Sequence, residues 1–301
     1  MVCVSYLAQA ELWTVPVFPL ANHGAEIRTI EWSVAADGPM TAAVLASLGA
    51  PTLLIANDIG DDEHGRGVAH WLEQRGVQRA FAIRPDVVTP RIVVSGDDQH
   101  TRTWFAHLPG VVASLERADL SPLADGAFVY LDCYELIESG ALRVIEVARA
   151  AEVPLLLNLG GSVLSTEVAA AVRGYSGLLV QTNVDDTAHA DAPALARSIL
   201  DRTRAAWVIV TAGAHGAVGL SRSERVLVPA FPVEVRHTHC AGAAFSGGLL
   251  YGLWAGWSVG QSMLLGSASG ALRCARHQGA PLPTLAELRA FIDSRQQFAA
   301  S

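Results

Sequence analysis

The chain has 301 residues, 51% of them hydrophobic and 17% charged, a composition that suits a compact globular fold and argues against a disordered chain. Its formal net charge of −8 argues against non-specific nucleic-acid binding, which depends on dense positive charge. The 21 basic residues are all arginines, so mechanisms that depend on a lysine, such as a P-loop or a Schiff base, are excluded.

The sequence predicts neither export nor membrane insertion. Segment 1–13 lacks a basic region and contains Glu11, unlike a signal peptide. The most apolar long stretch, 247–272, is rich in glycine and serine, which favours packed helices over a membrane span of about 20 residues. The cysteines form no CxxC pair, which is typical of reduced thiols. We therefore expect a cytoplasmic protein without membrane or nucleic-acid partners.

Short apolar runs alternate with amphipathic stretches along the chain, which is the pattern of βαβ units around a parallel sheet. Strands are predicted at 2–7, 52–56, 127–132, 154–159, 177–182 and 206–212. Helices are predicted at 39–48, 64–75, 140–151, 165–173, 193–203, 241–255, 259–277 and 284–293. Asp61 and Asp62 precede the second helix and are expected to cap it. No repeat or linker divides the elements, so a single α/β domain over 1–301 is expected.

Two segments interrupt this alternation, at about 13–36 and 87–107. Both contain alternating β-type sequence, EIRTIEWSV in the first and TPRIVVSGDDQHTRTWFAH in the second, without a crossover helix. The pattern predicts a small antiparallel sheet separate from the main one. Such a sheet serves either as a lid over a pocket or as a dimer contact. We favour the lid function, and a homodimer formed through this sheet is the alternative.

Glycine-containing segments near the C-terminus have an informative order and spacing. They read TAGAHG (211–216), HTHCAGAAFSGG (237–248) and SASGALRCARHQGA (267–280). They resemble the PfkB, or ribokinase-like, family of carbohydrate and nucleoside kinases, whose signature reads D-T-x-G-A-G-D-x-F-x-x-G. Segment 45–77 resembles the family's N-terminal signature, Asn183 to Asp186 align with its N-x-x-E motif, and 226–235 with its lead-in strand. The resemblance covers nearly the whole chain.

This resemblance implies a three-layer α/β/α fold with a mainly parallel central sheet and a β lid. It also implies transfer of a phosphoryl group from ATP, with Mg²⁺, to a hydroxyl of a sugar-, cyclitol- or nucleoside-like ligand. In the family, the helix that begins at G-A-G-D directs backbone N–H groups and its positive dipole end at the phosphates. The last Asp of that motif accepts the hydroxyl proton. Here Ala243 occupies its position, and a methyl group cannot accept a proton.

Other family positions have changed as well. The first motif Asp is His237, and the position two residues later is His239. Because these positions help to hold a monovalent cation in several family members, we expect no such cation here. The Gly-Gly and Asn that line the sugar site align with Ala35, Ala36 and Met40, and methionine offers no useful hydrogen bond to a sugar hydroxyl.

Polar residues remain on the ligand side of the implied pocket. Gln9 and Glu11 fall where the family's first strand ends in an Asn and an Asp that contact sugar hydroxyls. Arg91 and Arg102, on the predicted lid, are candidates for binding a phosphate or carboxylate, although exposed arginines on small sheets are often only solvated. The predicted ligand-side residues are Gln9, Glu11, Asp37, Met40, Arg91 and Arg102.

The nucleotide side is better preserved. Asp186 replaces the acid of the N-x-x-E motif with a shorter carboxylate that could still organise magnesium-bound water. Backbone N–H groups do not depend on side-chain identity, so the start of the 241–255 helix could still bind an anion. The predicted nucleotide- and anion-binding residues are Asn183, Asp186, Thr211, Gly213, Gly216, Cys240, Ala241 and Gly242.

The two histidines leave alternatives open. His237 and His239 are either a substitute base or metal pair, since histidine titrates near neutral pH, or structural residues that fill the lost cation site. With no third ligand identifiable, no metal site is predicted. Cys240 is either a reactive thiolate at a helix N-terminus or a small tolerated residue.

The protein is then one of several kinds. One alternative is a kinase that uses a substitute base such as His239. A second is a lyase, isomerase or cyclase with Glu11, His237 and His239 as acid–base groups. The third is a pseudokinase that senses a ligand or acts as a scaffold. We favour loss of ordinary kinase activity, because base and sugar-side positions have changed together.

Overall fold

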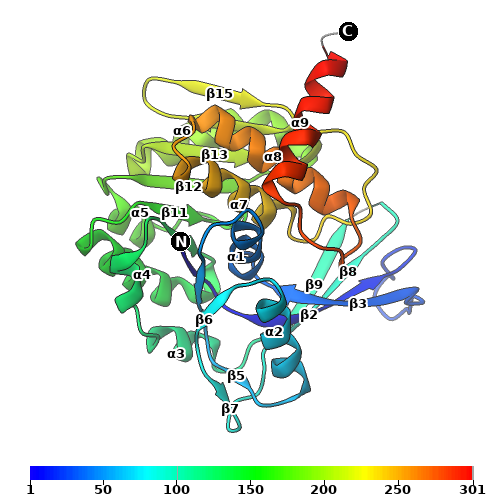
Figure 1. Ribbon diagram of the computed structural model, residues 1–301. Helices are drawn as coiled ribbons and strands as arrows, with labels where there is room; N and C mark the ends of the chain where they lie inside the picture. The colour runs from blue at the N-terminus through cyan, green and yellow to red at the C-terminus, as the bar shows by residue number, and fades with distance from the viewer. Residues whose placement is uncertain (100, 300–301) are drawn as a thin grey trace.

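The computed structural model of the protein describes residues 1–99 and 101–299 (Figure 1). Within these residues the main sheet has nine strands in the order β15-β14-β13-β12-β11-β10-β1-β4-β6. The pairs from β6 to β13 are parallel, and β14 and β15 continue antiparallel. The strands are β1 Val2–Val4, β4 Leu53–Ile55, β6 Gln78–Ala80, β10 Val129–Asp132, β11 Leu155–Asn158, β12 Leu178–Asn183, β13 Trp207–Thr211, β14 Ala217–Leu220 and β15 Arg225–Val228.

Helices cover both faces of this sheet, because its central strands are apolar on both sides (Figure 1). One core layer contains side chains of α4, α5 and α6, and the other contains side chains of α1, α2, α7 and α8. The helices are α1 Asp37–Ser47, α2 Glu63–Gln74, α3 Val111–Glu116, α4 Glu138–Ala150, α5 Thr166–Val172, α6 Ala192–Thr203, α7 Ala241–Trp254, α8 Val259–Ala275 and α9 Leu285–Ala299. The predicted three-layer α/β/α architecture is confirmed.

Each helix predicted from the sequence is present, and its ends lie within a few residues of the prediction except at the C-terminus of α9. The described residues also contain short elements that the sequence analysis did not separate. These are the short helix α3, the strands β6 and β14, the 3₁₀ turns η1 Ser121–Asp125, η2 Glu135–Ile137, η3 Asp186–Asp191 and η4 Gly213–His215, and the two-stranded sheet of β5 Ile59–Gly60 and β7 Ile83–Arg84. No helix among the described residues has the length and apolar character needed to cross a membrane.

The lid sheet stands apart from the main body, in the order β3-β2-β8-β9 (Figure 1). Its strands are β2 Ala8–Thr14, β3 Thr29–Ala35, β8 Arg91–Gly96 and β9 Arg102–His107. The outer pairs are antiparallel as expected, but the central pair, β2 and β8, is parallel. These two strands enter the sheet through separate connections from the main body, so no hairpin turn forces them to be antiparallel. Residue 100, in the predicted 87–107 segment, lies outside the described residues.

The strand predicted at 2–7 is wrong in length. β1 ends at Val4, and the lid begins at Ala8 rather than near residue 13. Between them, side-chain contacts replace the ladder of the main sheet: the Ser5 hydroxyl donates to Asp132 Oδ2 at 2.6 Å, and the Leu7 N–H donates to Asn57 Oδ1 at 2.8 Å. Apolar residues continue from β1 of the main sheet to β2 of the lid sheet, so the apolar pattern could not show where β1 ends.

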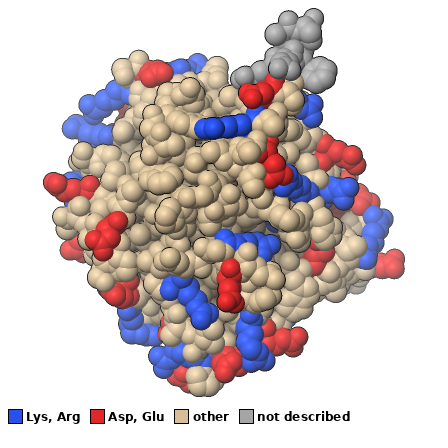
Figure 2. Space-filling model, viewed as in Figure 1, with Lys and Arg blue, Asp and Glu red and all other residues tan. Residues whose placement is uncertain are grey.

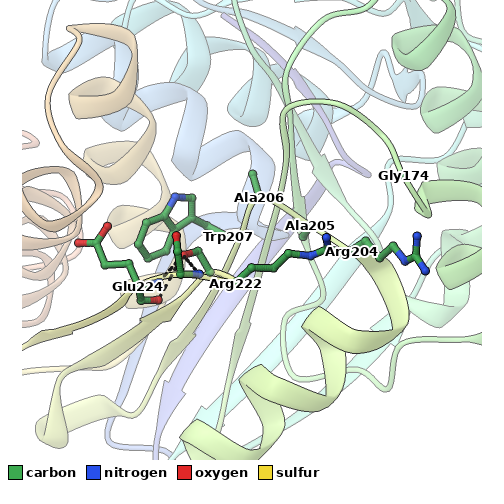
Figure 3. Close-up of a pocket in the computed structure, with 9 residues that line it drawn as sticks. Gly174, Arg204, Ala205, Ala206, Trp207, Arg222 and Glu224 are labelled. Atoms are coloured by element: carbon green, nitrogen blue, oxygen red, sulfur yellow. Dashed lines mark hydrogen bonds between the residues drawn. The ribbon is translucent and has the colours of Figure 1, made fainter.

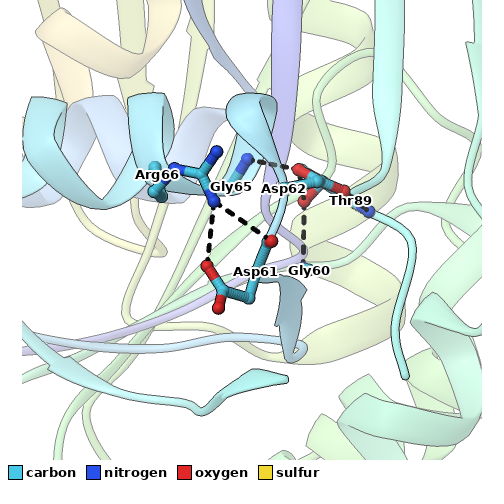
Figure 4. Close-up of polar contacts among 6 residues, drawn as sticks. All are labelled: Gly60, Asp61, Asp62, Gly65, Arg66 and Thr89. Carbon is cyan, nitrogen blue, oxygen red and sulfur yellow. Dashed lines mark hydrogen bonds and ion pairs between the residues drawn. The ribbon is translucent and has the colours of Figure 1, made fainter. Parts of the chain in front are cut away.

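Asp62 performs the capping role predicted for it at the start of α2 (Figure 4). Its Oδ1 accepts the Gly65 N–H at 2.7 Å and the Thr89 hydroxyl at 2.7 Å. Burial alone would raise the pKa of this carboxyl, but the hydrogen bonds from Gly65 and Thr89 outweigh it and lower the pKa. Asp61 instead pairs with Arg66 at 3.0 Å. The cap therefore connects α2 to Thr89, two residues before the lid strand β8.

Charged residues of both signs are interspersed on the face seen in Figure 2, and its centre is largely uncharged. On this face, therefore, no continuous basic surface suits a nucleic-acid backbone.

The core of the second layer depends on close backbone approach between α7 and α8. A Cβ added at Gly248 would lie 2.8 Å from Gly266 Cα and 2.9 Å from Leu265 O, and one added at Gly266 would lie 2.7 Å from Phe245 O. Cβ atoms do not tolerate backbone atoms at these distances. The two glycines therefore let the helices approach more closely than any larger residue would.

We predict that Gly248→Ala destabilises the protein although alanine is the better helix former. Overpacking typically costs about 1–3 kcal/mol and outweighs the gain in helix propensity of about 1 kcal/mol. The matched control is Gly67→Ala in α2, where an added Cβ meets nothing within 4 Å. The control should leave the free energy of unfolding unchanged or raise it, as measured by urea denaturation. A loss of stability in Gly67→Ala equal to that in Gly248→Ala would contradict this account of α7–α8 packing.

Candidate functional site

The candidate site lies at the carboxyl ends of the parallel strands, where α1 and α7 begin. Ligands of open α/β sheets bind at this edge. Helix α7 begins at Ala241 after Cys240, whose φ of 58° lies in the left-handed region. A Cβ added at Gly242 would meet nothing within 4 Å, so the space beside the first turn of α7 is open. Among the described residues, the Ala241 N–H bonds Thr238 O at 3.4 Å, whereas the N–H groups of Gly242 and Ala243 have no backbone partner, as is usual at a helix N-terminus.

The loop 237–240 that precedes α7 is held from two sides. From the lid, Arg102 Nη1 donates to Thr238 O at 3.3 Å, and His239 Nε2 bonds the carbonyl of Val34 in β3 at 3.1 Å. From the end of α8, the Arg276 carbonyl bonds His237 Nε2 at 3.0 Å. The loop is therefore the junction between the lid, α7 and α8.

Both histidines of this loop bond backbone carbonyls through Nε2. Burial lowers the pKa of His239 to about 3 and that of His237 to about 4, and the charge of nearby Arg273 acts in the same direction. A neutral ring must carry its proton on Nε2 to donate to a backbone carbonyl. We therefore do not carry either residue forward as a substitute base. Burial also raises the pKa of the Cys240 thiol to about 12, which does not favour a reactive thiolate.

The surroundings of Ala243 are apolar. Ala243 is fully buried in one hydrophobic cluster with Met40, Val44, Cys240 and Ala244. The Thr41 hydroxyl donates to its backbone carbonyl, Ala243 O, at 3.1 Å. Met40 and Ala243, two changes noted in the sequence, thus pack in the same cluster.

The start of α1 keeps a glycine-type backbone. Ala36, one of the residues aligned with the family's Gly-Gly, has a φ of 71° and a ψ of 163°. This combination is essentially restricted to glycine and is strained for any other residue. Ala36 therefore adopts a backbone conformation that is usually found only in glycine.

A polar network that the sequence analysis missed lies between α1 and the sheet. Asp132, at the end of β10, is completely buried and accepts hydrogen bonds from the Ser5 hydroxyl, the Gly38 N–H at 2.8 Å, the Tyr130 hydroxyl at 2.7 Å and Asn158 Nδ2 at 3.0 Å. Burial and the charge of Asp37 raise the pKa of Asp132, and the hydrogen bonds oppose this rise.

Asp37 joins the same network but reaches the surface. Its Oδ2 accepts the Tyr134 hydroxyl at 2.8 Å and Asn158 Nδ2 at 3.0 Å, and the residue is half-buried. The prediction that Asp37 lies on the ligand side therefore remains open and is favoured by its position. The sequence did contain a signal for the partners of Asp37. Asp132 and Asn158 lie at the carboxyl ends of two neighbouring predicted strands, and the carboxyl ends of parallel strands meet at one edge of the sheet.

Gln9, Glu11 and Arg91 do not join this site. Side chains alternate along β2, and the opposite set, Ala8 and Ala10, packs near Tyr6 on the side of Asp37. Glu11 forms an ion pair with Arg91. Trp32, which lies opposite Glu11 on the neighbouring strand, stacks on His64 of α2. Gln9 is 3% exposed, and its amide atoms have no hydrogen-bond partner among the described residues. These side chains lie on the face of the lid sheet away from Asp37.

The predicted nucleotide-side residues gather at the ends of β12 and β13. Asn183 and Thr211 are register partners, and Asp186 lies so close to Gly213 that a Cβ there would be 1.9 Å from its Oδ1. Gly216, with a φ of 87°, completes the turn. His189 and His215, which the sequence analysis did not include, stack beside them with ring centroids 3.7 Å apart.

Hydrogen bonds between β12 and α7 join this group to the start of α7. Gln181 Nε2 donates to Gly242 O at 3.4 Å, and its Oε1 accepts the Ser246 hydroxyl at 3.0 Å. The strand that carries Asn183 is thus fastened directly to the first turns of α7.

A surface cavity of about 650 Å³ lies away from all of these residues (Figure 3). Trp207, at the amino end of β13, lines it together with Arg204, Arg222 and Glu224. It therefore opens at the sheet edge opposite the candidate site, and none of the predicted site residues lines it.

Comparison with known families matches residues 37–285 to the model described as pfkB family carbohydrate kinase. A 5-dehydro-2-deoxygluconokinase of Shouchella clausii (strain KSM-K16) is 20% identical over 259 residues, which cover 79% of each chain. A putative ribokinase from Agrobacterium tumefaciens superposes with a TM-score of 0.80 at 19% identity, covering 98% of each chain. Arabidopsis thaliana ribokinase complexed with ribose and ATP has a TM-score of 0.77 at 18% identity, covering 97% of each chain.

We predict that His239 makes folding stability depend on pH. Its pKa is lower in the folded protein, so below the ordinary histidine pKa of about 6.5 the unfolded chain binds a proton that the folded chain does not. The free energy of unfolding should therefore fall as pH falls from about 6 to 4, by up to about 1.4 kcal/mol per pH unit from this group. His239→Gln, which keeps a donor for Val34 O, should show a shallower fall in urea denaturation. The exposed His23→Gln serves as control, and equal slopes for wild type and His239→Gln would refute the assignment.

Proposed function

The chain belongs to the pfkB family of carbohydrate kinases, and we propose that it binds a sugar-, cyclitol- or nucleoside-like ligand but has lost phosphoryl transfer at ordinary kinase rates. The single observation that carries the second part is the buried methyl group of Ala243 at the position of the family's proton acceptor. The surrounding side chains of Met40, Val44 and Cys240 provide no acceptor in its place.

Other residues do not compensate for this loss. Loss of a general base typically costs about 10²–10⁴-fold in rate. His237 and His239 would be the nearest substitutes in sequence, but both Nε2 atoms bond backbone carbonyls, and burial holds both rings neutral. Residual transfer, supported by positioning and electrostatics, is therefore the most that we expect from the wild-type site.

We propose that the phosphates of an ATP-type nucleotide lie at the start of α7. The open space at Gly242, the link from Gln181 to Gly242 O and the close fit of Gly213 to Asp186 support this placement. ATP would supply the phosphoryl group. No group of three His, Cys, Asp or Glu residues in the described ranges is arranged to hold a metal ion, so Mg²⁺ would depend on phosphate oxygens with Asp186 nearby.

One observation favours a second candidate, a non-kinase reaction on the same kind of ligand. Asp37 is a half-buried carboxylate next to Tyr134 and Asn158, and no cation pairs with it in the described part of the chain. Such a carboxylate can accept a proton from a bound ligand. A ligand sensor without turnover is the remaining alternative, and it predicts no chemistry in any of the variants described below.

We also propose that two copies of the chain associate through the lid sheet. Ile30, Trp32 and Phe105 lie on one face of that sheet by strand alternation, and their exposed fractions are 54%, 54% and 69%. Large exposed apolar side chains grouped on one face favour a protein contact. The same surface would then fix the position of the lid over the site.

We predict that restoring the base requires two changes. In Ala243→Asp alone, the new carboxylate would lie against Met40 in an apolar cluster, which would disfavour its charged form. Met40→Asn with Ala243→Asp supplies a polar neighbour and should raise ATP-dependent phosphorylation of a panel of sugars, cyclitols and nucleosides by about 10²–10⁴-fold over wild type.

The control for this experiment is Ala150→Asp, which adds a carboxylate at an exposed position of α4, outside the predicted site. It should leave the rate at the wild-type level. Phosphorylation by the wild type at about 1–100 s⁻¹, the range of ordinary kinases, would contradict the proposed loss. A product without ATP turnover would instead favour the non-kinase candidate, and Asp37→Asn should then abolish it.

We predict that Phe105→Asp shifts the protein from dimer to monomer in sedimentation equilibrium, because it places a charge in the proposed contact. Leu227→Asp on the edge strand β15 is the matched control, since Leu227 is similarly exposed, at 61%, but lies on the main sheet. The control should remain dimeric. A monomeric wild type, or dissociation in both variants, would rule out a dimer built on this face.

A further inference from the structure

Arg273, on α8, is a buried cation without a carboxylate partner. Its exposed fraction is only 3%, and no carboxylate of the described residues forms an ion pair with it. Burying an uncompensated charge is costly, so other groups must stabilise it. Burial lowers the pKa of the guanidinium, but arginine still remains protonated in proteins.

Carbonyl oxygens from two loops provide that stabilisation. Arg273 Nε donates to His239 O at 3.3 Å, Nη1 donates to Gln278 O at 3.3 Å, and Nη2 donates to Gln278 Oε1. One loop, 237–240, precedes α7, and the other, 276–280, follows α8. Neutral carbonyl oxygens converging on a single charge are also what holds a dissolved monovalent cation. The guanidinium therefore occupies the kind of site that an ion would fill, but it is attached to the chain.

The contact with His239 acts on the start of α7. The His239 carbonyl directly precedes Cys240, whose left-handed backbone determines where the first N–H groups of α7 point. Just before this loop, the Arg236 N–H donates to Cys274 O at 2.9 Å, and within it Thr238 O accepts a hydrogen bond from Arg102 of the lid. Of these contacts, only that of Arg273 brings a buried charge to the loop.

We propose that Arg273 is a positioning residue that serves as a built-in monovalent cation for loops 237–240 and 276–280. It orients the first N–H groups of α7 toward an anionic ligand, so neither folding nor anion binding by this chain needs a dissolved monovalent cation. The effect on anion binding rests on the proposed function, whereas the cation site itself does not.

The test removes the guanidinium and adds it back in solution. Arg273→Ala leaves a space lined by the freed carbonyl oxygens, and its melting temperature should rise saturably with guanidinium or potassium chloride at about 10–20 mM, by the linkage expected for a ligand of the folded state. Tetramethylammonium chloride at equal ionic strength should have no effect. Wild type should show no rise with any of the three salts.

Arg149→Ala is the matched control, because Arg149 also bridges two backbone carbonyls, Ala171 O at 2.8 Å and Arg173 O at 3.4 Å, but is exposed on α4. It should lose some stability without any cation-dependent recovery. An Arg273→Ala protein that folds only with guanidinium or potassium supports the proposal. A variant unaffected by both cations, or unfolded in every salt, overturns it, as does a potassium-dependent rise in the wild type.

Binding of ADP, measured by calorimetry, provides the second readout. Arg273→Ala should weaken it by about 10- to 100-fold, the effect of losing hydrogen bonds to a charged group, and either cation should restore it. Arg273→Lys keeps a charge and should bind more tightly than Arg273→Ala. If the wild type binds no ADP while the melting temperature of Arg273→Ala still responds to cations, the nucleotide part of the proposed function fails and the cation site stands.

Discussion

A carboxylate removed from solvent persists only where donors converge on it, and Asp132 imposes that constraint on this fold. Its donors come from Ser5 in the connection between β1 and β2, from Gly38 at the start of α1 and from Asn158 at the end of β11. These bonds determine where the chain leaves the main sheet and where α1 begins. The ligand side of the site and the base of the lid are thus fixed by one buried side chain.

Much of this architecture could be predicted from the sequence, because it follows from periodicity and from spacing. The helices were recovered because their apolar residues repeat at helical intervals, and the order of the glycine segments led to the family and its fold. The resemblance to the family signature also predicts that Ala243 occupies the position of its proton acceptor, and the structure shows that Ala243 is buried among apolar side chains. What a one-dimensional pattern could not show was which face of a strand a residue occupies.

The ligand side illustrates that limit. Gln9 and Glu11 have the chemical character expected of sugar-binding residues, but a one-residue difference in register places them on the other face of β2 from Ala8 and Ala10. The roles of His239 and Arg273 were equally hidden, because their partners are backbone carbonyls contributed by distant segments. Carbonyl groups have no signature in the sequence, so such contacts become visible only in the folded chain.

The parallel pairing of β2 and β8 has a mechanical consequence. Because β2 and β8 enter the lid sheet through separate connections, and because β3 leaves it toward α1 and β9 leaves it toward α3, four connections join this sheet to the main body. Two of them are held by carboxylates: the Ser5 hydroxyl donates to Asp132, and the Thr89 hydroxyl donates to Asp62 (Figure 4). A sheet joined at four places cannot bend at a single hairpin, so any displacement of the lid has to be shared among all four connections.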